Sequence, residues 1–256
     1  MRVLKWLVLS VALLAARSSF ADTNVAVQAA APEKDWSVTA SADYFSTYLF
    51  RGVDITHSPV AVPSLVGTYK GLTAYYYGYY AEQNHGSGTY AENDYGADWT
   101  QSVFNDKLSL TGGAVGYTYL NGRSGTATWE VYASATWKDY LNPKLAINWD
   151  VDRIRGGYAQ ASISHQYDLS KLAGLPDGKL TLTPSAALGY DLGYNDRSTT
   201  KNAEFNDVLL GVLVSYNVND HLSVHGGYQG SIALDAITDN GQSNVSVFNG
   251  GVTYLF

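Results

Sequence analysis

The chain has 256 residues, a formal net charge of −7 at pH 7 and no cysteine. The acidic balance argues against a nucleic-acid binder, because affinity for a phosphate backbone comes from Lys and Arg. Without cysteine there is no disulfide framework and no thiol chemistry. The 21 Tyr and 6 Trp are residue types enriched at membrane–water interfaces, where one end of the ring is apolar and the other is wet.

Residues 1–21 have the pattern of a secretory signal peptide. Arg2 and Lys5 precede the apolar stretch Trp6–Ala16, which is too short to span a membrane as a helix. We expect cleavage after Ala21. Residues 1–21 carry three basic and no acidic side chains, so cleavage would change the net charge from −7 to −10. Residues 22–35 lack periodicity, and we expect a flexible tail there.

From residue 36 onward, alternation of apolar and polar residues recurs about every 20 residues, with turn residues between the runs. Only 169–175 has a weak helical period, and no other stretch approaches the 18 apolar residues of a transmembrane helix. The sequence therefore predicts an all-β fold. The expected strands are 36–49, 60–69, 72–82, 91–103, 107–120, 127–138, 144–152, 157–167, 179–193, 207–217, 222–234 and 244–256.

The connections between these runs alternate between tight turns and longer loops rich in Gly, Asn, Asp and Ser, with one long exception at 168–178. Bacterial outer-membrane barrels have an even strand number, short periplasmic turns and longer outer loops. Because lipid offers no partners for exposed backbone groups, such a sheet must close on itself. We predict that residues 36–256 form a transmembrane antiparallel up-and-down β-barrel of about twelve strands. We place it in the outer membrane of a Gram-negative bacterium, with both termini and the tail periplasmic.

The last expected strand carries the signal for barrel closure. Its apolar face holds Phe248, Val252, Tyr254 and the final Phe256. A terminal strand of this kind resembles the segment that the barrel-assembly machinery reads in outer-membrane proteins. We therefore expect outer-membrane lipid and this machinery as partners.

Strand parity places the polar face of each strand in the lumen. The apolar face, which includes Tyr44, Tyr48, Trp129 and Trp149, is expected to contact lipid. The acidic residues that parity places in the lumen are Asp43, Glu92, Asp94, Asp98, Glu130, Asp150, Asp152 and Asp191. Five of them are expected at a similar height, namely Glu92, Asp94, Glu130, Asp150 and Asp152, and Arg51 and Arg153 are among the basic residues nearest that level. Acidic walls would favour cations in a constriction. Alternatively, the acids and arginines pair across the lumen and plug it, a real option at twelve strands because eight leave no pore and sixteen leave a wide one.

No catalytic residue, metal site or cofactor is predicted. His221 and His225 share a strand face but lie roughly 13 Å apart at about 3.3 Å per residue, too far for one zinc ion. The pair Ser223 and His225 invites comparison with an outer-membrane phospholipase, yet it faces the lumen, away from lipid. The glycines of 112–116 lie within a strand and form no phosphate loop.

Several segments together resemble the TorF-like family of outer-membrane porins, over roughly residues 37–135. The segments are Ser41–Asp54 with its Arg51-Gly52 pair, Glu92-Asn93-Asp94-Tyr95, Tyr117-Thr118-Tyr119 and Trp129-Glu130-Val131-Tyr132. The resemblance implies an outer-membrane barrel, with no established substrate. We expect a channel for passive diffusion of small polar solutes with a mild cation preference. The alternative is a plugged structural or surface-binding barrel that does not conduct.

Overall fold

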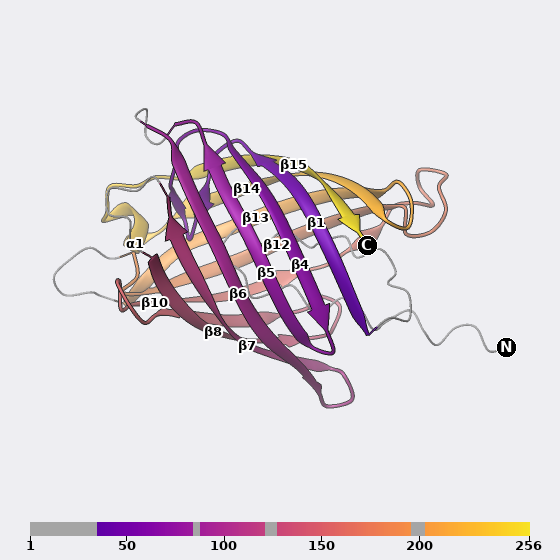
Figure 1. Ribbon diagram of the computed structural model, residues 1–256, viewed down its shortest axis with the longest axis horizontal. Helices are drawn as coiled ribbons and strands as arrows, with labels where there is room; N and C mark the ends of the chain where they lie inside the picture. Colours follow the sequence, from indigo (N-terminus) through magenta and orange to yellow (C-terminus); the bar gives the residue numbers. More distant parts are fainter. Residues whose placement is uncertain (1–34, 84–87, 121–126, 196–202) are drawn as a thin grey trace.

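The computed structural model describes residues 35–83, 88–120, 127–195 and 203–256 (Figure 1). Within these ranges, twelve long strands form one antiparallel sheet that closes on itself. The expected signal peptide and all but the last residue of the expected tail lie outside the described residues. The long strands are β1 (Trp36–Phe45), β4 (Val60–Tyr69), β5 (Leu72–Ala81), β6 (Tyr90–Val103), β7 (Leu108–Tyr119), β8 (Ala127–Trp137), β9 (Lys144–Asp150), β10 (Gly157–Ser164), β12 (Leu180–Leu192), β13 (Ala203–Asn217), β14 (Leu222–Ala233) and β15 (Val245–Leu255).

The sheet closes where the first and last strands meet. Strand β15 pairs with β14 on one side and with β1 on the other, with Tyr254 opposite Ala40. Strand β10 pairs with β12, so each long strand has a neighbour on both sides. The prediction of a closed up-and-down barrel of about twelve strands is confirmed. In the part of the chain that is described, no helix is long and apolar enough to cross a membrane.

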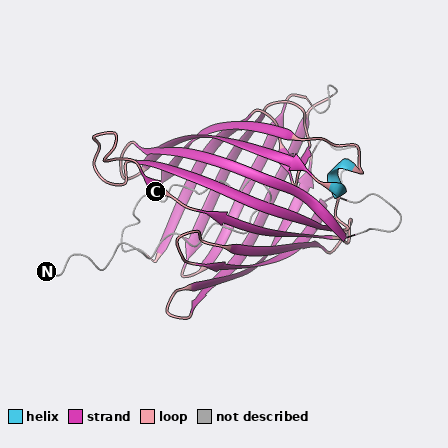
Figure 2. Ribbon diagram, turned by 180° about the vertical axis from the view of Figure 1, so that it is seen from behind, coloured by secondary structure: helices cyan, strands magenta, loops and turns pink. Residues whose placement is uncertain are grey.

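The two ends of the barrel differ in their connections, as Figures 1 and 2 show. One end carries the tight turns, together with the start of β1 and the end of β15. In the turn between β4 and β5, Lys70 and Gly71 have φ values of 46° and 90°. A Cβ on Gly71 would lie 2.7 Å from the carbonyl oxygen of Thr100, so this turn requires glycine. The other end carries longer connections, including the short helix α1 (Asp235–Thr238).

The long connection expected at 168–178, at the end that otherwise carries tight turns, is also present. It holds turns rather than the weakly indicated helix at 169–175, and it begins with the short strand β11 (Tyr167–Asp168) beside β12. Asp168 fastens this connection by accepting hydrogen bonds from the backbone N–H groups of Ser170 and Gly178, both at 2.9 Å. The Ser170 side chain and these two N–H groups hold the pKa of Asp168 below its usual value.

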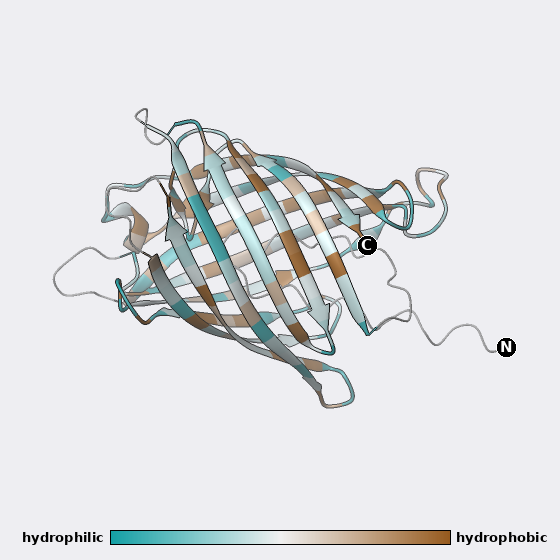
Figure 3. Ribbon diagram, viewed as in Figure 1, coloured by the Kyte–Doolittle hydropathy of each residue, from teal (hydrophilic) through white to brown (hydrophobic). Residues whose placement is uncertain are grey.

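Hydrophobic and hydrophilic residues alternate along the strands (Figure 3), and their exposures place the apolar face outside, as parity predicts. On the outer surface, Trp129, Trp149 and Val252 are 44%, 41% and 45% exposed. On the inner surface, Glu92 and Glu130 are buried. An apolar outer face and a polar inner face on a closed sheet are the arrangement of a transmembrane barrel.

The first expected strand is wrong beyond Phe45. Strand β1 ends there, and residues 46–57 fold into the barrel as an interior hairpin containing β2 (Leu49–Phe50) and β3 (Val53–Asp54). Tyr48, expected on the outer face with Tyr44, is therefore 1% exposed, whereas Tyr44 is 57% exposed. The hydrogen bond from Ser46 N–H to the Phe248 carbonyl marks the point where the chain leaves the wall.

The interior is not polar throughout. The hairpin residues Tyr48 and Leu49 pack with inward-facing Phe45, Val60 and Val247 in an apolar cluster. Strand β4 carries apolar residues on both faces. Its sequence therefore does not predict that the valines of one face line the lumen. The cluster packs against the hairpin and thereby fills part of the barrel half that carries the long connections.

A charge on the outer face tests the orientation of the wall. Leu210 lies midway along β13 and is 47% exposed. In lipid, Leu210→Arg is expected to lower the free energy of unfolding by about 2–4 kcal/mol, because the guanidinium must enter hydrocarbon. Leu210→Met is the matched control and should change little. Urea titration in lipid vesicles, followed by tryptophan fluorescence, measures both; equal stabilities of the two variants would contradict this orientation.

Candidate functional site

The interior hairpin is held in shape by its own polar side chains. The hydroxyl of Thr56 accepts a hydrogen bond from Tyr48 N–H at 3.1 Å and donates one to the Ser58 carbonyl at 2.8 Å. Thr47 donates to the carboxylate of Asp54 at 2.5 Å. At the tip, Arg51 and Gly52 have φ values of 49° and 80°, which makes a tight turn. The hairpin therefore presents Arg51 to the centre of the barrel.

Arg51 forms a bidentate ion pair with Glu130 of β8. Nη1 and Nη2 of Arg51 lie 2.8 and 2.6 Å from Oε1 and Oε2 of Glu130. The two side chains are 1% and 0% exposed, and the hydroxyl of Tyr117 donates a further hydrogen bond to Glu130 at 3.1 Å. A fork-to-fork pair of this geometry is the arrangement that best offsets the desolvation of both charges.

Aromatic rings surround the guanidinium of Arg51. Its central carbon lies 4.7, 5.2 and 4.2 Å from the ring centroids of Phe50, Tyr158 and Tyr194. These distances fall within the range of cation–π attraction. The rings exclude water from the pair and so strengthen its electrostatic attraction.

Another part of the wall, at β12 and β13, holds the backbone of the hairpin tip. The carbonyl of Arg51 accepts hydrogen bonds from the side-chain amides of Asn195 and Asn206, at 3.0 and 2.9 Å. A Cβ on Gly52 would lie 3.1 Å from both Asn206 and Ile237 of α1. The tip is thus attached to β8 through the Arg51 side chain and to the β12–β13 side through its backbone, so the hairpin crosses the lumen from β1.

Strand β6 supplies three buried acids. Glu92 accepts hydrogen bonds from the hydroxyls of Tyr48, at 3.2 Å, and Tyr90. Asp94 is 3% exposed, and its Oδ1 has no hydrogen-bond partner among the described residues. Further along the strand, Asp98 accepts a hydrogen bond from Tyr132 at 3.0 Å. Glu92 and Asp94 therefore lie close to the hairpin without an ion-pair partner in the described chain.

Other acids named from the sequence have local partners. Asp150 accepts hydrogen bonds from Thr128 at 2.6 Å and from Ile154 N–H at 2.9 Å, so it fastens the loop that follows β9. That strand ends at Asp150 and not at 152, because the side chain of Asp150 holds the next residues in a turn. Asp152 and Arg153 consequently lie in the loop and are exposed, which corrects their expected place on the lumen wall.

Asp43 lies apart from the hairpin tip and pairs with His225, whose Nε2 is 2.7 Å from its Oδ1. Ser223 makes no hydrogen bond with His225 in the described structure, so these residues form no hydrolase triad. Across the described ranges, no group of three or more His, Cys, Asp or Glu residues could hold a metal ion.

Of the residues named from the sequence, the structure brings together Arg51, Glu92, Asp94 and Glu130. Sequence reasoning missed Tyr48, Asn195 and Asn206, which the hairpin brings into contact with this group or with its own backbone. Their signal was weak, because parity had placed Tyr48 outside and the two Asn residues occur in stretches typical of loops.

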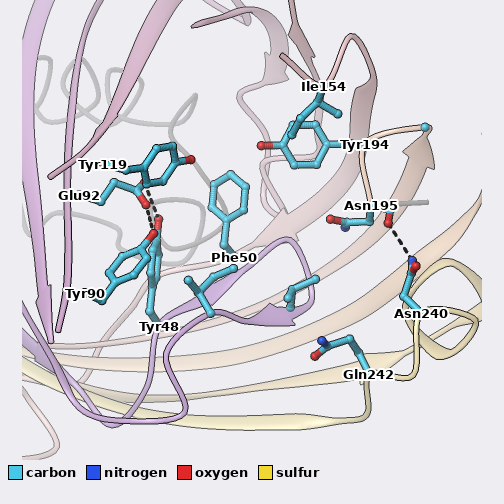
Figure 4. Close-up of a pocket in the computed structure, with 13 residues that line it drawn as sticks. Tyr48, Phe50, Tyr90, Glu92, Tyr119, Ile154, Tyr194, Asn195, Asn240 and Gln242 are labelled. Atoms are coloured by element: carbon cyan, nitrogen blue, oxygen red, sulfur yellow. Dashed lines mark hydrogen bonds between the residues drawn. The ribbon is translucent and has the colours of Figure 1, made fainter. Parts of the chain in front are cut away.

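A cavity of about 520 Å³ lies above this group, at the end of the barrel that carries the long loops (Figure 4). Rings of Tyr48, Phe50, Tyr90, Tyr119 and Tyr194 line it with the carboxylate of Glu92. Three amide side chains, Asn195, Asn240 and Gln242, lie on the same side as Tyr194, across the cavity from Tyr48, Tyr90, Tyr119 and Glu92.

No family model and no curated protein matches the sequence. Among solved structures, the chain is similar to the KdgM porin at 12% identity and a TM-score of 0.55, over 86% of this chain and 99% of that one. It is also similar to the NanC porin at 11% identity and a TM-score of 0.53, over 85% and 98% of the two chains. At these identities the likeness shows that the chain has the barrel fold of these porins.

The pair of Arg51 and Glu130 can be tested by a double-mutant cycle. Arg51→Met leaves Glu130 buried without a counter-charge and is expected to cost about 3–5 kcal/mol of stability. The double variant Arg51→Met/Glu130→Leu should recover most of this loss, because two apolar side chains of similar size replace the pair. Urea unfolding of the refolded barrel gives both values; a double variant no more stable than Arg51→Met would contradict the coupling.

Proposed function

We propose that the protein is an outer-membrane channel for passive diffusion of small polar solutes, with a mild preference for cations. The observation that carries the proposal is the interior charge of a barrel with a porin fold. Arg51 is balanced by Glu130, whereas Glu92, Asp94 and Asp98 add buried acids on one strand. A lumen with excess negative charge concentrates cations and disfavours anions.

The proposed location is the outer membrane of a Gram-negative bacterium, with both termini in the periplasm. The tight turns lie at the same end as the start of β1 and the end of β15, which in bacterial barrels is the periplasmic end. Phe248, Val252, Tyr254 and Phe256 all project from the outer face of the closing strand, where lipid and the barrel-assembly machinery would meet them. The motifs quoted above support assignment to the TorF-like family.

The interior hairpin would narrow the conducting path. It leaves the wall at β1 and contacts β8 and β13 across the lumen, and the residues at its level are almost fully buried. We therefore expect a conductance well below that of a wide sixteen-strand porin.

The same hairpin favours a second candidate function, a plugged barrel that binds a partner at its surface and does not conduct. The specific observation is the Arg51–Glu130 pair, which joins the hairpin to β8. The measurable difference between the two candidates is whether ions pass the level of the hairpin in the native protein.

Conductance across planar bilayers separates these candidates. The native barrel is expected to give small single-channel steps, with a reversal potential that shows cation preference in a salt gradient. A folded native barrel without steps would reject the channel and leave the plugged barrel.

A hairpin-deletion variant supplies the control for that experiment. Because Phe45 and Val60 are paired across β1 and β4, an Asn-Gly turn can replace residues 46–59 without altering the wall. This variant is expected to conduct several-fold more than the native barrel, since the deleted segment occupies the lumen.

The acids of β6 can be tested separately through ion selectivity. The double variant Glu92→Gln/Asp94→Asn removes two negative charges from the interior and is expected to shift the reversal potential toward zero. Asp152→Asn removes one charge from an exposed loop and serves as the control. Equal reversal potentials in the native protein and the β6 variant would contradict the assignment of selectivity to these acids.

A further inference from the structure

We infer that the cavity above the interior hairpin is a binding site for small organic cations. The proposal goes beyond conductance, because a solute can bind there whether or not the barrel conducts.

The first argument is the chemistry of the cavity lining. Five aromatic rings and one carboxylate, that of Glu92, surround the space, and no Lys or Arg lines it among the described residues (Figure 4). Aromatic faces carry negative partial charge and attract a cation directly. An anionic solute would find no cationic side chain in this lining.

The second argument is the charge of the surroundings. Glu92 is 2% exposed, and its hydrogen-bond partners are the hydroxyls of Tyr48 and Tyr90 and the side chain of Asp94. Asp94, two residues further on the same strand face, is 3% exposed and leaves Oδ1 without a partner in the described structure. Buried carboxylates without a counter-charge are unfavourable. A cation in the cavity would supply the missing charge.

The third argument distinguishes an organic cation from a metal ion. A metal site needs several oxygen or nitrogen ligands in contact with the ion, and no such group exists in the described residues. The rings of Phe50 and Tyr194 instead already hold the guanidinium of Arg51. The interior thus binds an organic cation of its own through ring faces and a carboxylate.

The size and the polar side of the cavity narrow the class further. A volume of about 520 Å³ suits a small molecule. The amides of Asn195, Asn240 and Gln242 can donate to, or accept from, a hydroxyl or amine substituent. A small quaternary or primary amine that carries a hydroxyl group fits this combination.

The experiment uses choline and its neutral isostere 3,3-dimethyl-1-butanol as probes. The refolded full barrel is titrated with each probe by calorimetry in dodecyl maltoside, whose headgroup is uncharged. Choline is expected to bind at least about tenfold more tightly than the isostere, because only choline carries the charge. Absence of choline binding, or equal affinity for both probes, would overturn the proposal.

Three variants locate the site. Glu92→Gln is expected to weaken choline binding about tenfold, and Tyr119→Leu about threefold through loss of one ring. Asp152→Asn changes an acid outside the cavity and should leave the affinity unchanged. Unchanged choline affinity in Glu92→Gln would refute the site. If Glu92→Gln does not fold, as judged by heat-modifiable gel mobility, Tyr119→Leu and the isostere comparison decide.

Bilayer recordings on the same preparation keep this proposal separate from the proposed channel. Choline binding without conductance steps would reject the channel and support the cation site. Steps without choline binding would support the channel and reject the cation site.

Discussion

The ion pair between Arg51 and Glu130 is the contact on which the arrangement of the barrel interior depends. Neither charge could remain buried alone, since desolvation of a single ion costs several kcal/mol. The pair therefore requires the hairpin to stay folded inward, with its tip across the lumen. The aromatic rings around Arg51 and the amides that hold its carbonyl fix the same position from the other sides. One residue, Arg51, thus connects β8 and β10 through its side chain and the β12–β13 side of the wall through its backbone.

The interior acids divide into three groups according to what neutralises or binds them. Glu130 has a cation. Asp150 and Asp191 accept hydrogen bonds from the backbone of the loops that follow their strands, so they stabilise loop structure. Glu92 and Asp94 have neither a cation nor a backbone donor; tyrosine hydroxyls donate to Glu92, and the two acids bond to each other beside the cavity and the hairpin. We therefore assign the proposed selectivity and binding at this level to two residues of β6 rather than to the whole set of acids that parity placed inside.

Much of the wall could be predicted from the sequence, because lipid imposes a strict period of two on a closed sheet. The bounds of β4 match those expected, and Trp129 and Trp149 lie on the outer face as predicted. The hairpin could not be predicted in this way. The alternation from Tyr44 to Tyr48 continues past the point where β1 ends, and the inward turn is stabilised by Asn206, which lies 155 positions away from Arg51. The expected strand 144–152 is too long for a related reason, because parity alone does not reveal that Asp150 accepts hydrogen bonds from the backbone of the next turn.

The apolar packing of the hairpin bears on how firmly the lumen is narrowed. If water entered at the level of Arg51, both members of the pair would be solvated, and their attraction would fall toward the roughly 0–1 kcal/mol of an exposed ion pair. Electrostatics alone would then hold the hairpin weakly. Leu49 and Tyr48, however, are 0% and 1% exposed against Phe45, Val60 and Val247, and an outward movement would expose them to water. Fully burying one such side chain is worth about 1.5–3 kcal/mol. The apolar cluster therefore keeps the hairpin inside and the site dry, and this dryness is what makes the Arg51–Glu130 pair strong.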